Sequence, residues 1–427
     1  MTILTIVSIM RSTRDSAAPM KFGAVGGRRA VTMRIALDAR TIYRPMRRGT
    51  AKNLVDLYGH VARLRPAWRV VAFHRTDGEL PPLMPETVCQ PKLIEMIGDR
   101  VDAWGRWRLP LAAWRAGADL LHCPSNHCPT WLPLPAVVTI HDLIPLDMPQ
   151  GRDSMQVRRF EQSIRSACRE AVWIICPSRY TRDRLVDDFD ADRNRITVNH
   201  WAPDGALRLV PQDKWPHVLA RYGVRCPFVL HFGAASPRKN TRRLIHAWQE
   251  MHQSLRRHWQ LLIVGLDPGF AAQLNALVAQ MNLTQNVILR GFADEADIPA
   301  LLSAADVLAY PSLSEGFGLP ILDAWKTETP VLASSRTALP EVAGDAALLV
   351  DPTSTDAITD GLEQLLEFPL CRAELVQRGR SRVGAFDWQR TAQRFVHAME
   401  QAAALAESRR QTEPLAGTCT IHDHIST

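Results

Sequence analysis

The stretch Pro311-Ser-Leu-Ser-Glu315-Gly-Phe-Gly-Leu-Pro320-Ile-Leu-Asp323-Ala-Trp325 carries the signals from which the fold can be inferred. The apolar run Val307–Tyr310 just before it is typical of a buried strand, and Pro320 suits the first turn of a helix. The loop between them carries the carboxylate of Glu315 and two glycines, which allow the backbone to approach a ligand closely. A second acid, Asp323, follows about one turn into the helix. The stretch predicts a strand–loop–helix unit that holds a ligand bearing hydroxyls and phosphate.

Short apolar strands alternate with helical segments on both sides of this stretch. In the first half of the chain we expect strands at 34–38, 69–73, 119–123, 136–142, 172–176 and 196–199. In the second half we expect them at 228–232, 260–264, 287–289, 307–310, 330–333 and 347–350. This alternation predicts parallel sheets that are covered by helices on both faces.

The length of 427 residues allows two or three domains at roughly 150 residues each. The expected division is a disordered extension over 1–32, an N-terminal domain over 33–205, a linker over 206–226, a second domain over 227–386, a C-terminal helix over 387–410 and a tail over 411–427. In each domain, polar clusters follow the strands, at 47–50, 141–142, 238–239 and 315–319. Ligands bind beyond the carboxyl ends of such strands, so we expect one ligand between two facing domains.

Several of these segments, taken in order, resemble family 4 of the retaining glycosyltransferases. The resemblance rests on Ser314–Pro320 with an acid at 323, on Pro237–Asn240 and on Val138–Leu143, and it extends from about residue 33 to 406. Further matching segments are 339–344, 349–352 and 386–388. The resemblance implies the GT-B fold, in which two Rossmann-like, doubly wound parallel-sheet domains face each other across a cleft.

The resemblance also implies roles for individual residues. It places the candidate catalytic residues Glu315 and His141 beside the donor sugar, and it assigns donor contacts to the backbone of Gly316, Phe317, Gly318 and Leu319. Asp323 stands where the family usually has a glutamate that bonds the ribose, so a shorter side chain replaces the usual one. Arg238 and Lys239 resemble the pair that holds the pyrophosphate, and Gly49 resembles the glycine that meets the phosphates from the first domain. Phe292 lies at the position that contacts the nucleotide base in this family. The alternative is that Phe292 packs in the core.

Each of these residues also has a simpler structural interpretation. Glu315 could cap the following helix, and Asp323 would stabilise a helix start in any case. Arg238 and Lys239 could form a solvated turn, and His141 could be a core histidine. Gly49 could be an ordinary turn glycine.

The residue types suit transfer of a sugar from a nucleotide. A guanidinium, an ammonium and helix-start amides balance the charge of a nucleoside-diphosphate leaving group without a metal. We expect no metal site and no cofactor, because no acidic pair stands out and the cluster His122–Cys128 lacks a second ligand pair at zinc spacing. The nucleotide-sugar is then a substrate.

The expected function is retaining transfer of a hexose from a nucleotide-sugar to a glycan or lipid-linked acceptor in cell-surface polysaccharide biosynthesis. Residues 37–40 and 139–145 together are similar to polysaccharide mannosyltransferases, which favours GDP-mannose as donor. The alternative is a GT-B protein that binds a nucleotide-sugar without transferring it. Other GT-B enzymes, such as phosphorylases and epimerases, match fewer motifs.

The net charge of +7 comes almost entirely from arginine and favours acidic partners. Nucleic-acid binding is not expected, because no recognition motif is present and the arginines are scattered. A peripheral contact with an anionic membrane, where lipid-linked acceptors sit, is the other hypothesis. No apolar run reaches the roughly 18 residues of a membrane span. Eight cysteines without a CxxC pair predict a reducing cytoplasm.

Overall fold

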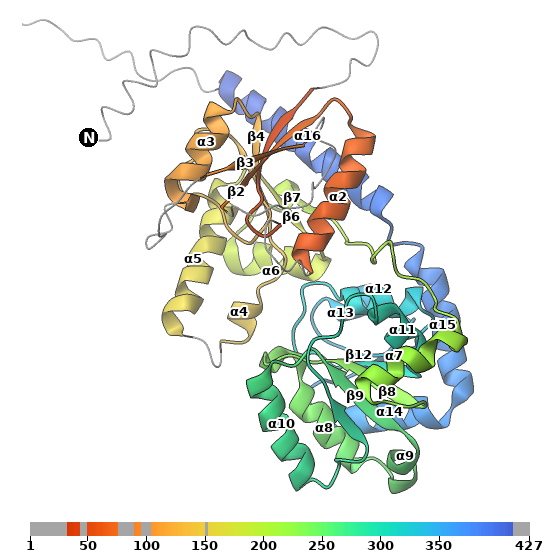
Figure 1. Cartoon of the computed structure of the whole chain (residues 1–427). Coiled ribbons are helices and arrows are strands. Elements are labelled where there is room, and N and C mark those ends of the chain that lie inside the picture. The colour runs from red at the N-terminus through yellow and green to blue at the C-terminus, as the bar shows by residue number, and fades with distance from the viewer. Residues whose placement is uncertain (1–31, 43–48, 76–88, 95–103, 150–152, 413–427) are drawn as a thin grey trace, which may run out of the picture. The chain divides into compact units, whose positions relative to one another are not determined.

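The computed structural model describes residues 32–42, 49–75, 89–94, 104–149 and 153–412 (Figure 1). The expected N-terminal extension, most of the basic loop before Gly49 and the end of the C-terminal tail lie outside the described residues. So does most of the segment 76–108.

The first sheet has the seven strands that follow, all paired in parallel. They are β1 (Arg34–Asp38), β2 (Arg69–His74), β3 (Cys89–Leu93), β4 (Leu120–Cys123), β5 (Ala136–Thr139), β6 (Trp173–Cys176) and β7 (Ile196–Val198). Their spatial order, β3-β2-β1-β4-β5-β6-β7, reverses direction at β1 and β4, as in a Rossmann fold.

The second sheet repeats this order with six parallel strands. They are β8 (Phe228–Phe232), β9 (Gln260–Val264), β10 (Val287–Leu289), β11 (Val307–Tyr310), β12 (Val331–Ser334) and β13 (Leu348–Val350). The order is β10-β9-β8-β11-β12-β13. Two Rossmann-like sheets in series confirm the predicted GT-B fold class.

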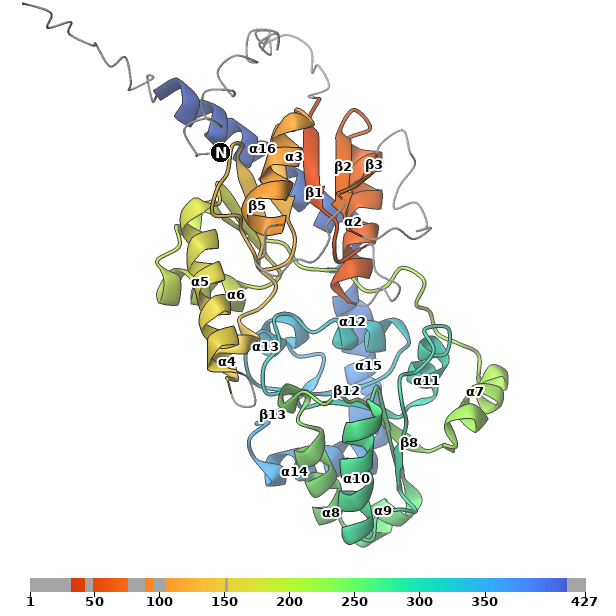
Figure 2. The same ribbon diagram turned by 60° about the vertical axis from the view of Figure 1, so that its left-hand side comes forward.

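Helices connect the strands and cover both faces of each sheet (Figures 1 and 2). Those of the first half are α2 (Thr50–Leu64), a π-helical turn (Trp104–Arg108), α3 (Leu109–Arg115), α4 (Ile144–Asp147), α5 (Ser154–Glu170) and α6 (Arg179–Phe189). Those of the second half are α7 (Trp215–Tyr222), α8 (Thr241–Glu250), α9 (Gln253–His258), α10 (Pro268–Gln280), α11 (Ile298–Ala304), α12 (Leu319–Lys326), α13 (Leu339–Ala343), α14 (Thr355–Glu367), α15 (Pro369–Val383) and α16 (Trp388–Thr412). Single 3-10 turns lie at Arg193–Arg195, Gln212–Lys214 and Pro237–Lys239.

Alternate residues of the first sheet point to two different cores, as the pleat of a strand requires. Ile35 and Leu37 of β1 join a core with α2 and α16, whereas Ala36 joins a core with α3, α5 and α6. The C-terminal helix α16 therefore packs on the first sheet, although it follows the second in the chain (Figure 1). Its Phe395 ring contacts the rings of Tyr58 and His122, with centroid distances of 5.5 and 5.1 Å.

His122 is a core histidine. It is fully buried, and its ring nitrogens bond the hydroxyls of Tyr58 at 2.7 Å and Thr139 at 2.9 Å. Burial lowers the pKa of His122 to about 3, so the ring is neutral. No group of three metal-ligating side chains occurs among the residues that the structure describes.

Three local predictions were incomplete or wrong. Strand β3 was missed, because Cys89-Gln-Pro-Lys-Leu93 has no apolar run; its exposed residues and Pro91 suit the edge position that it occupies. The pattern of residues 104–114 predicts a helix, and in the structure this segment starts with the π-helical turn. Asparagine at position 240, just before the helical stretch from Thr241, predicts a side-chain cap. Asn240 does precede α8, but its side chain does not cap the helix and donates instead to the carbonyls of Pro311 at 3.0 Å and Pro352 at 2.6 Å.

Candidate functional site

Glu315 lies in the loop between β11 and α12 and is buried against two cations. Its Oε1 accepts hydrogen bonds from the Lys239 ammonium at 2.8 Å and from the Arg238 guanidinium. Both cations come from the 3-10 turn after β8, the strand beside β11 in the sheet. The Lys239 ammonium also donates to the Tyr310 hydroxyl at 3.1 Å. The structure thus joins the acidic loop and the basic loop, which are 77 residues apart in the chain.

These contacts keep Glu315 ionised. Burial alone raises the pKa of a carboxyl, but Lys239 and Arg238 outweigh burial and hold the pKa of Glu315 below its ordinary value. Burial lowers the pKa of Lys239, and the Glu315 carboxylate opposes that shift. A buried carboxylate shared by two cations is therefore the electrostatic centre of this site, and the interpretation of 238–239 as a solvated turn is wrong.

Gly316 brings the loop against the first sheet. A Cβ added to Gly316 would lie 2.0 Å from the carbonyl oxygen of His141 and 2.7 Å from Cβ of Asp142. Only glycine fits here, because the obstructing atoms belong largely to the backbone. His141 follows β5, so this approach brings together the carboxyl ends of strands from both sheets, as the sequence predicts.

The orientation of His141 is fixed by three neighbours. Its amide donates to Asn126 Oδ1 at 2.6 Å, and its Nε2 bonds the carbonyl of Pro124 at 2.6 Å. Since a carbonyl only accepts, Nε2 carries the proton and Nδ1 is left as an acceptor when the ring is neutral. The ring stacks on Trp201 at 5.8 Å, and burial lowers its pKa. The side chain is therefore held as a neutral imidazole at the edge of the first sheet.

The rest of the glycine loop is tightly held. Phe317 is buried, stacks on His200 at 5.8 Å and meets the edge of Phe386 at 6.0 Å. Gly318 has φ +121°, a value that L-residues rarely adopt, and a Cβ there would meet Leu339 at 2.6 Å. Leu319 begins α12, and Pro320 lies in its first turn as the sequence predicts.

Asp323 lies in α12, and its Oδ1 accepts a long hydrogen bond of 3.4 Å from the amide of Asp204. Burial raises the pKa of Asp323 to about 7, although Lys52, which is bound to Asp204, opposes the shift. A carboxyl that titrates near neutral pH can donate as well as accept a hydrogen bond.

The two remaining candidates lie at the start of α2 and after β10. Gly49 has φ +50° and forms the N-cap of α2, so the backbone itself requires glycine, and nothing within 4 Å would obstruct a Cβ. Phe292 is 56% exposed, which excludes the core-packing alternative. Among the described residues, no hydrogen bond or ion pair joins Gly49 or Phe292 to Glu315.

Sequence reasoning missed Glu341, whose side chain is 10% exposed and whose carboxylate meets the start of α6. Its carboxylate accepts from the amides of Arg179 at 2.8 Å and Tyr180 at 3.2 Å, and it bonds Nε2 of His200 at 2.9 Å. Glu341 lies in α13 of the second half, whereas α6 belongs to the first half, so this carboxylate links the two. The sequence signal that could have identified Glu341 was its position in Leu339-Pro-Glu341, shortly after the strand expected at 330–333.

We expect Glu341→Gln to destabilise the protein by about 1–3 kcal/mol at pH 7, the range for a weakened bond to a buried charged group. Burial raises the pKa of Glu341, but its bond with His200 and the helix amides outweigh burial and lower it. The stabilisation is therefore full above the unfolded-state pKa, near 4.5, and is lost as the pH falls through the folded-state value. Denaturant unfolding at pH 7 and below pH 4 measures this difference. Asp345→Asn, at an exposed carboxylate just after α13, is the control. An equal loss of stability in both variants would contradict the prediction.

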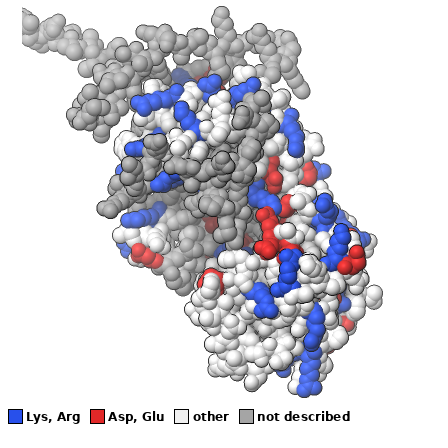
Figure 3. Space-filling model, in the orientation of Figure 1, with Lys and Arg blue, Asp and Glu red and all other residues white. Residues whose placement is uncertain are grey.

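Charged side chains on the face seen in Figure 3 are mixed in sign where the described residues are visible. Blue and red atoms lie side by side there, without a continuous positive stripe. The described residues contain no helix that is long and apolar enough to span a bilayer. All seven cysteines in the described part of the chain are free thiols.

Two family models cover most of this chain. Residues 48–202 match "Glycosyltransferase Family 4", and residues 224–382 match "Glycosyl transferases group 1". O-antigen chain mannosyltransferase B of Escherichia coli is 31% identical over 315 residues, which is 72% of this chain and 80% of that protein. The chain belongs to the GT-B glycosyltransferases.

Other relatives agree with this assignment. The glycosyltransferase is 34% identical over 186 residues to the MMP alpha-(1->4)-mannosyltransferase of Mycolicibacterium hassiacum, which is 42% of this chain and 44% of that protein. Among solved structures, its fold is similar to sucrose-phosphate synthase from Thermosynechococcus elongatus, with a TM-score of 0.70 at 21% identity, covering 87% and 99% of the two chains. It is also similar to WaaG, a glycosyltransferase of lipopolysaccharide biosynthesis, with a TM-score of 0.67 at 17% identity, covering 87% and 99%.

Proposed function

We propose that this glycosyltransferase transfers mannose from GDP-mannose to a growing cell-surface polysaccharide, with retention of configuration. The observation that carries the proposal is the cluster of Glu315, Arg238 and Lys239 against the backbone of His141. It provides fixed cations for a diphosphate, a carboxylate for sugar hydroxyls and a neutral imidazole, all at the carboxyl ends of the two sheets. The names of the mannosyltransferase relatives support mannose as the sugar and a glycan as the acceptor.

In this proposal Arg238 and Lys239 hold the pyrophosphate and stabilise the negative charge that develops as the sugar leaves. Both cations are bound to Glu315 without a ligand, so a diphosphate would share them with the carboxylate. The amides of Gly316–Leu319 at the start of α12 supply further donors, and Gly49 at the start of α2 supplies donors from the first domain. The leaving phosphate then accepts the proton of the attacking acceptor hydroxyl on the same face of the sugar.

Two further assignments complete the donor site. Asp323 bonds the ribose hydroxyls, directly or through water, and the exposed ring of Phe292 covers the base. The proposed domains are 33–205 on the acceptor side and 227–386 on the nucleotide-sugar side, joined by the linker 206–226.

The proposal is tested by thermal shift with UDP, GDP, ADP and their sugars, followed by a transfer assay with the nucleotide-sugar that binds. We expect GDP and GDP-mannose to stabilise the protein, by about 2.7 kcal/mol at a concentration of 100 times Kd. We then expect release of GDP to depend on an α-mannoside acceptor. If only UDP and its sugars stabilised the protein, the donor would be a UDP-sugar and not GDP-mannose. Binding without any transfer would overturn the enzymatic proposal.

We also propose that the enzyme works in the cytoplasm, in peripheral contact with an anionic membrane surface. The support is the net charge of +7, since basic side chains are attracted to anionic lipids. Sedimentation with vesicles tests the contact: it should increase with the fraction of anionic lipid and decrease with salt. Equal sedimentation with neutral and anionic vesicles would overturn it.

A further inference from the structure

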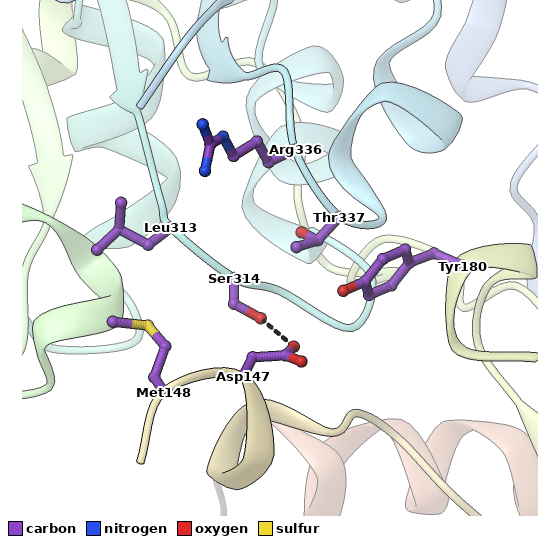
Figure 4. Close-up of a pocket in the computed structure, with 7 residues that line it drawn as sticks. All are labelled: Asp147, Met148, Tyr180, Leu313, Ser314, Arg336 and Thr337. Atoms are coloured by element: carbon purple, nitrogen blue, oxygen red, sulfur yellow. Dashed lines mark hydrogen bonds between the residues drawn. The ribbon is translucent and has the colours of Figure 1, made fainter. Parts of the chain in front are cut away.

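We propose that a pocket between α4, α6 and the loops after β11 and β12 binds a neutral sugar residue of the acceptor. The pocket has a volume of about 480 Å³, within the range of small-molecule sites (Figure 4). Asp147 and Tyr180 line it from the first half of the chain, and Ser314, Arg336 and Thr337 line it from the second half. This inference rests on the proposed function, because it supplies the acceptor site for that reaction.

The pocket adjoins the proposed donor site through two direct connections. Ser314 is the neighbour of Glu315 in the chain, and its hydroxyl points into the pocket toward Asp147 (Figure 4). The hydroxyl of Thr337, which also lines the pocket, accepts the amide hydrogen of Glu315 at 3.1 Å. A sugar in this pocket would therefore lie next to the carboxylate that we place beside the donor sugar.

The lining is chemically suited to a neutral sugar. Asp147 is 13% exposed, and it accepts from the Ser314 hydroxyl at 2.9 Å and from the Arg184 guanidinium. These bonds fix its orientation, yet a carboxylate has about four acceptor positions, so it can still accept from sugar hydroxyls. The hydroxyls of Tyr180 and Thr337 add polar positions, while Met148 and Leu313 offer apolar surface to the C–H groups of a sugar ring. The charges at the lining are paired, Asp147 with Arg184 and Arg336 with Asp351, so the pocket suits a neutral ligand.

The backbone of Thr337 gives independent support. Its φ is +59°, in the left-handed region, which is a genuine outlier for a β-branched residue. Such strain is unfavourable and concentrates at ligand sites, where the surrounding structure maintains it. Here the strained residue both lines the pocket and bonds the amide of Glu315, so its conformation ties the pocket to the proposed catalytic loop.

The test measures sugar transfer from GDP-mannose to α-linked mannotriose in Asp147→Asn and Tyr180→Phe. Asp147→Asn preserves shape but removes a charged acceptor, so we expect the KM for mannotriose to rise about 10- to 100-fold. Tyr180→Phe removes only one neutral hydroxyl and should raise this KM about 2- to 10-fold. The affinity for GDP, measured without acceptor, should stay within about twofold of wild type, because neither side chain contacts Arg238 or Lys239.

Asp188→Asn is the matched control, because Asp188 also binds Arg184 but does not line the pocket. Its KM for mannotriose should equal that of wild type, and thermal melting checks that all variants are folded. An unchanged KM in both pocket variants, with transfer by the wild type intact, would overturn the acceptor site and leave the proposed function standing. A wild-type protein that neither binds GDP nor releases it from GDP-mannose would overturn the proposed function and the acceptor site together.

Discussion

Gly316→Ala is expected to reduce kcat/KM for sugar transfer at least about 100-fold while both sheets remain folded. The new Cβ would stand 2.0 Å from the carbonyl oxygen of His141, far inside van der Waals contact. The obstruction is backbone that is itself fixed by the bond from the His141 amide to Asn126, so it cannot move aside like a flexible side chain. Relief requires the loop of Glu315 to withdraw from His141, and a displacement of about 1 Å at a reacting centre can cost about 100-fold in rate.

Steady-state transfer kinetics measure this effect, and circular dichroism with thermal melting reports whether the fold is retained. Gly59→Ala is the matched control, because Gly59 lies within α2 and a Cβ there meets nothing within 4 Å. The control should keep wild-type activity and gain about 0.5–1 kcal/mol of stability, the helix advantage of alanine. Wild-type activity of Gly316→Ala would show that the close approach to His141 is not needed for transfer.

Glu315→Gln should lower kcat by about 100- to 1,000-fold, the usual effect of removing one group that stabilises a transition state. The side chain keeps its size but loses its charge, so Arg238 and Lys239 lose the carboxylate that they share. Both cations then become more available to a diphosphate. We therefore expect GDP to bind as tightly as in wild type or more tightly, although transfer is nearly lost.

Isothermal titration with GDP and a transfer assay together separate binding from catalysis. Glu328→Gln is the control, because Glu328 also pairs with an arginine, Arg380, in an exposed position where ion pairs contribute little. Parallel losses of GDP affinity and of transfer in Glu315→Gln would contradict the assigned role. They would show that Glu315 serves mainly to hold the fold of the loop.

The sequence was most informative about features that depend on a single strand and the loop that follows it. Apolar runs such as Val307–Tyr310 predicted nearly every buried strand, because a strand covered on both faces has few polar residues. The polar clusters after those strands predicted that Glu315, Arg238 and Lys239 would meet, since parallel strands end at the same edge. Strand β3 was missed because it lies at an edge, where polar residues and proline are tolerated.

The individual side-chain contacts between loops could not be inferred in this way. The bond between Ser314 and Asp147 depends on how the loops of the two halves approach each other. The bond between Thr337 and the Glu315 amide depends on the shapes of two loops of the second half. Glu341 likewise satisfies amides of α6 that lie more than 150 residues away in the chain. Each residue looks like an ordinary polar residue until its partner is known.

The return of α16 to the first sheet has a consequence for how the enzyme can open. The chain passes between the two halves twice, once after β7 and once between α15 and α16, so two covalent tethers join them. Two tethers restrict opening to rotation about an axis through both, whereas a single linker would also allow swivelling. The return also means that residues 33–205 expressed alone would lack one wall of their own core, because Phe395 and its neighbours in α16 cover that face. A folded fragment of the first half would therefore have to include α16, joined to it or supplied as a separate peptide.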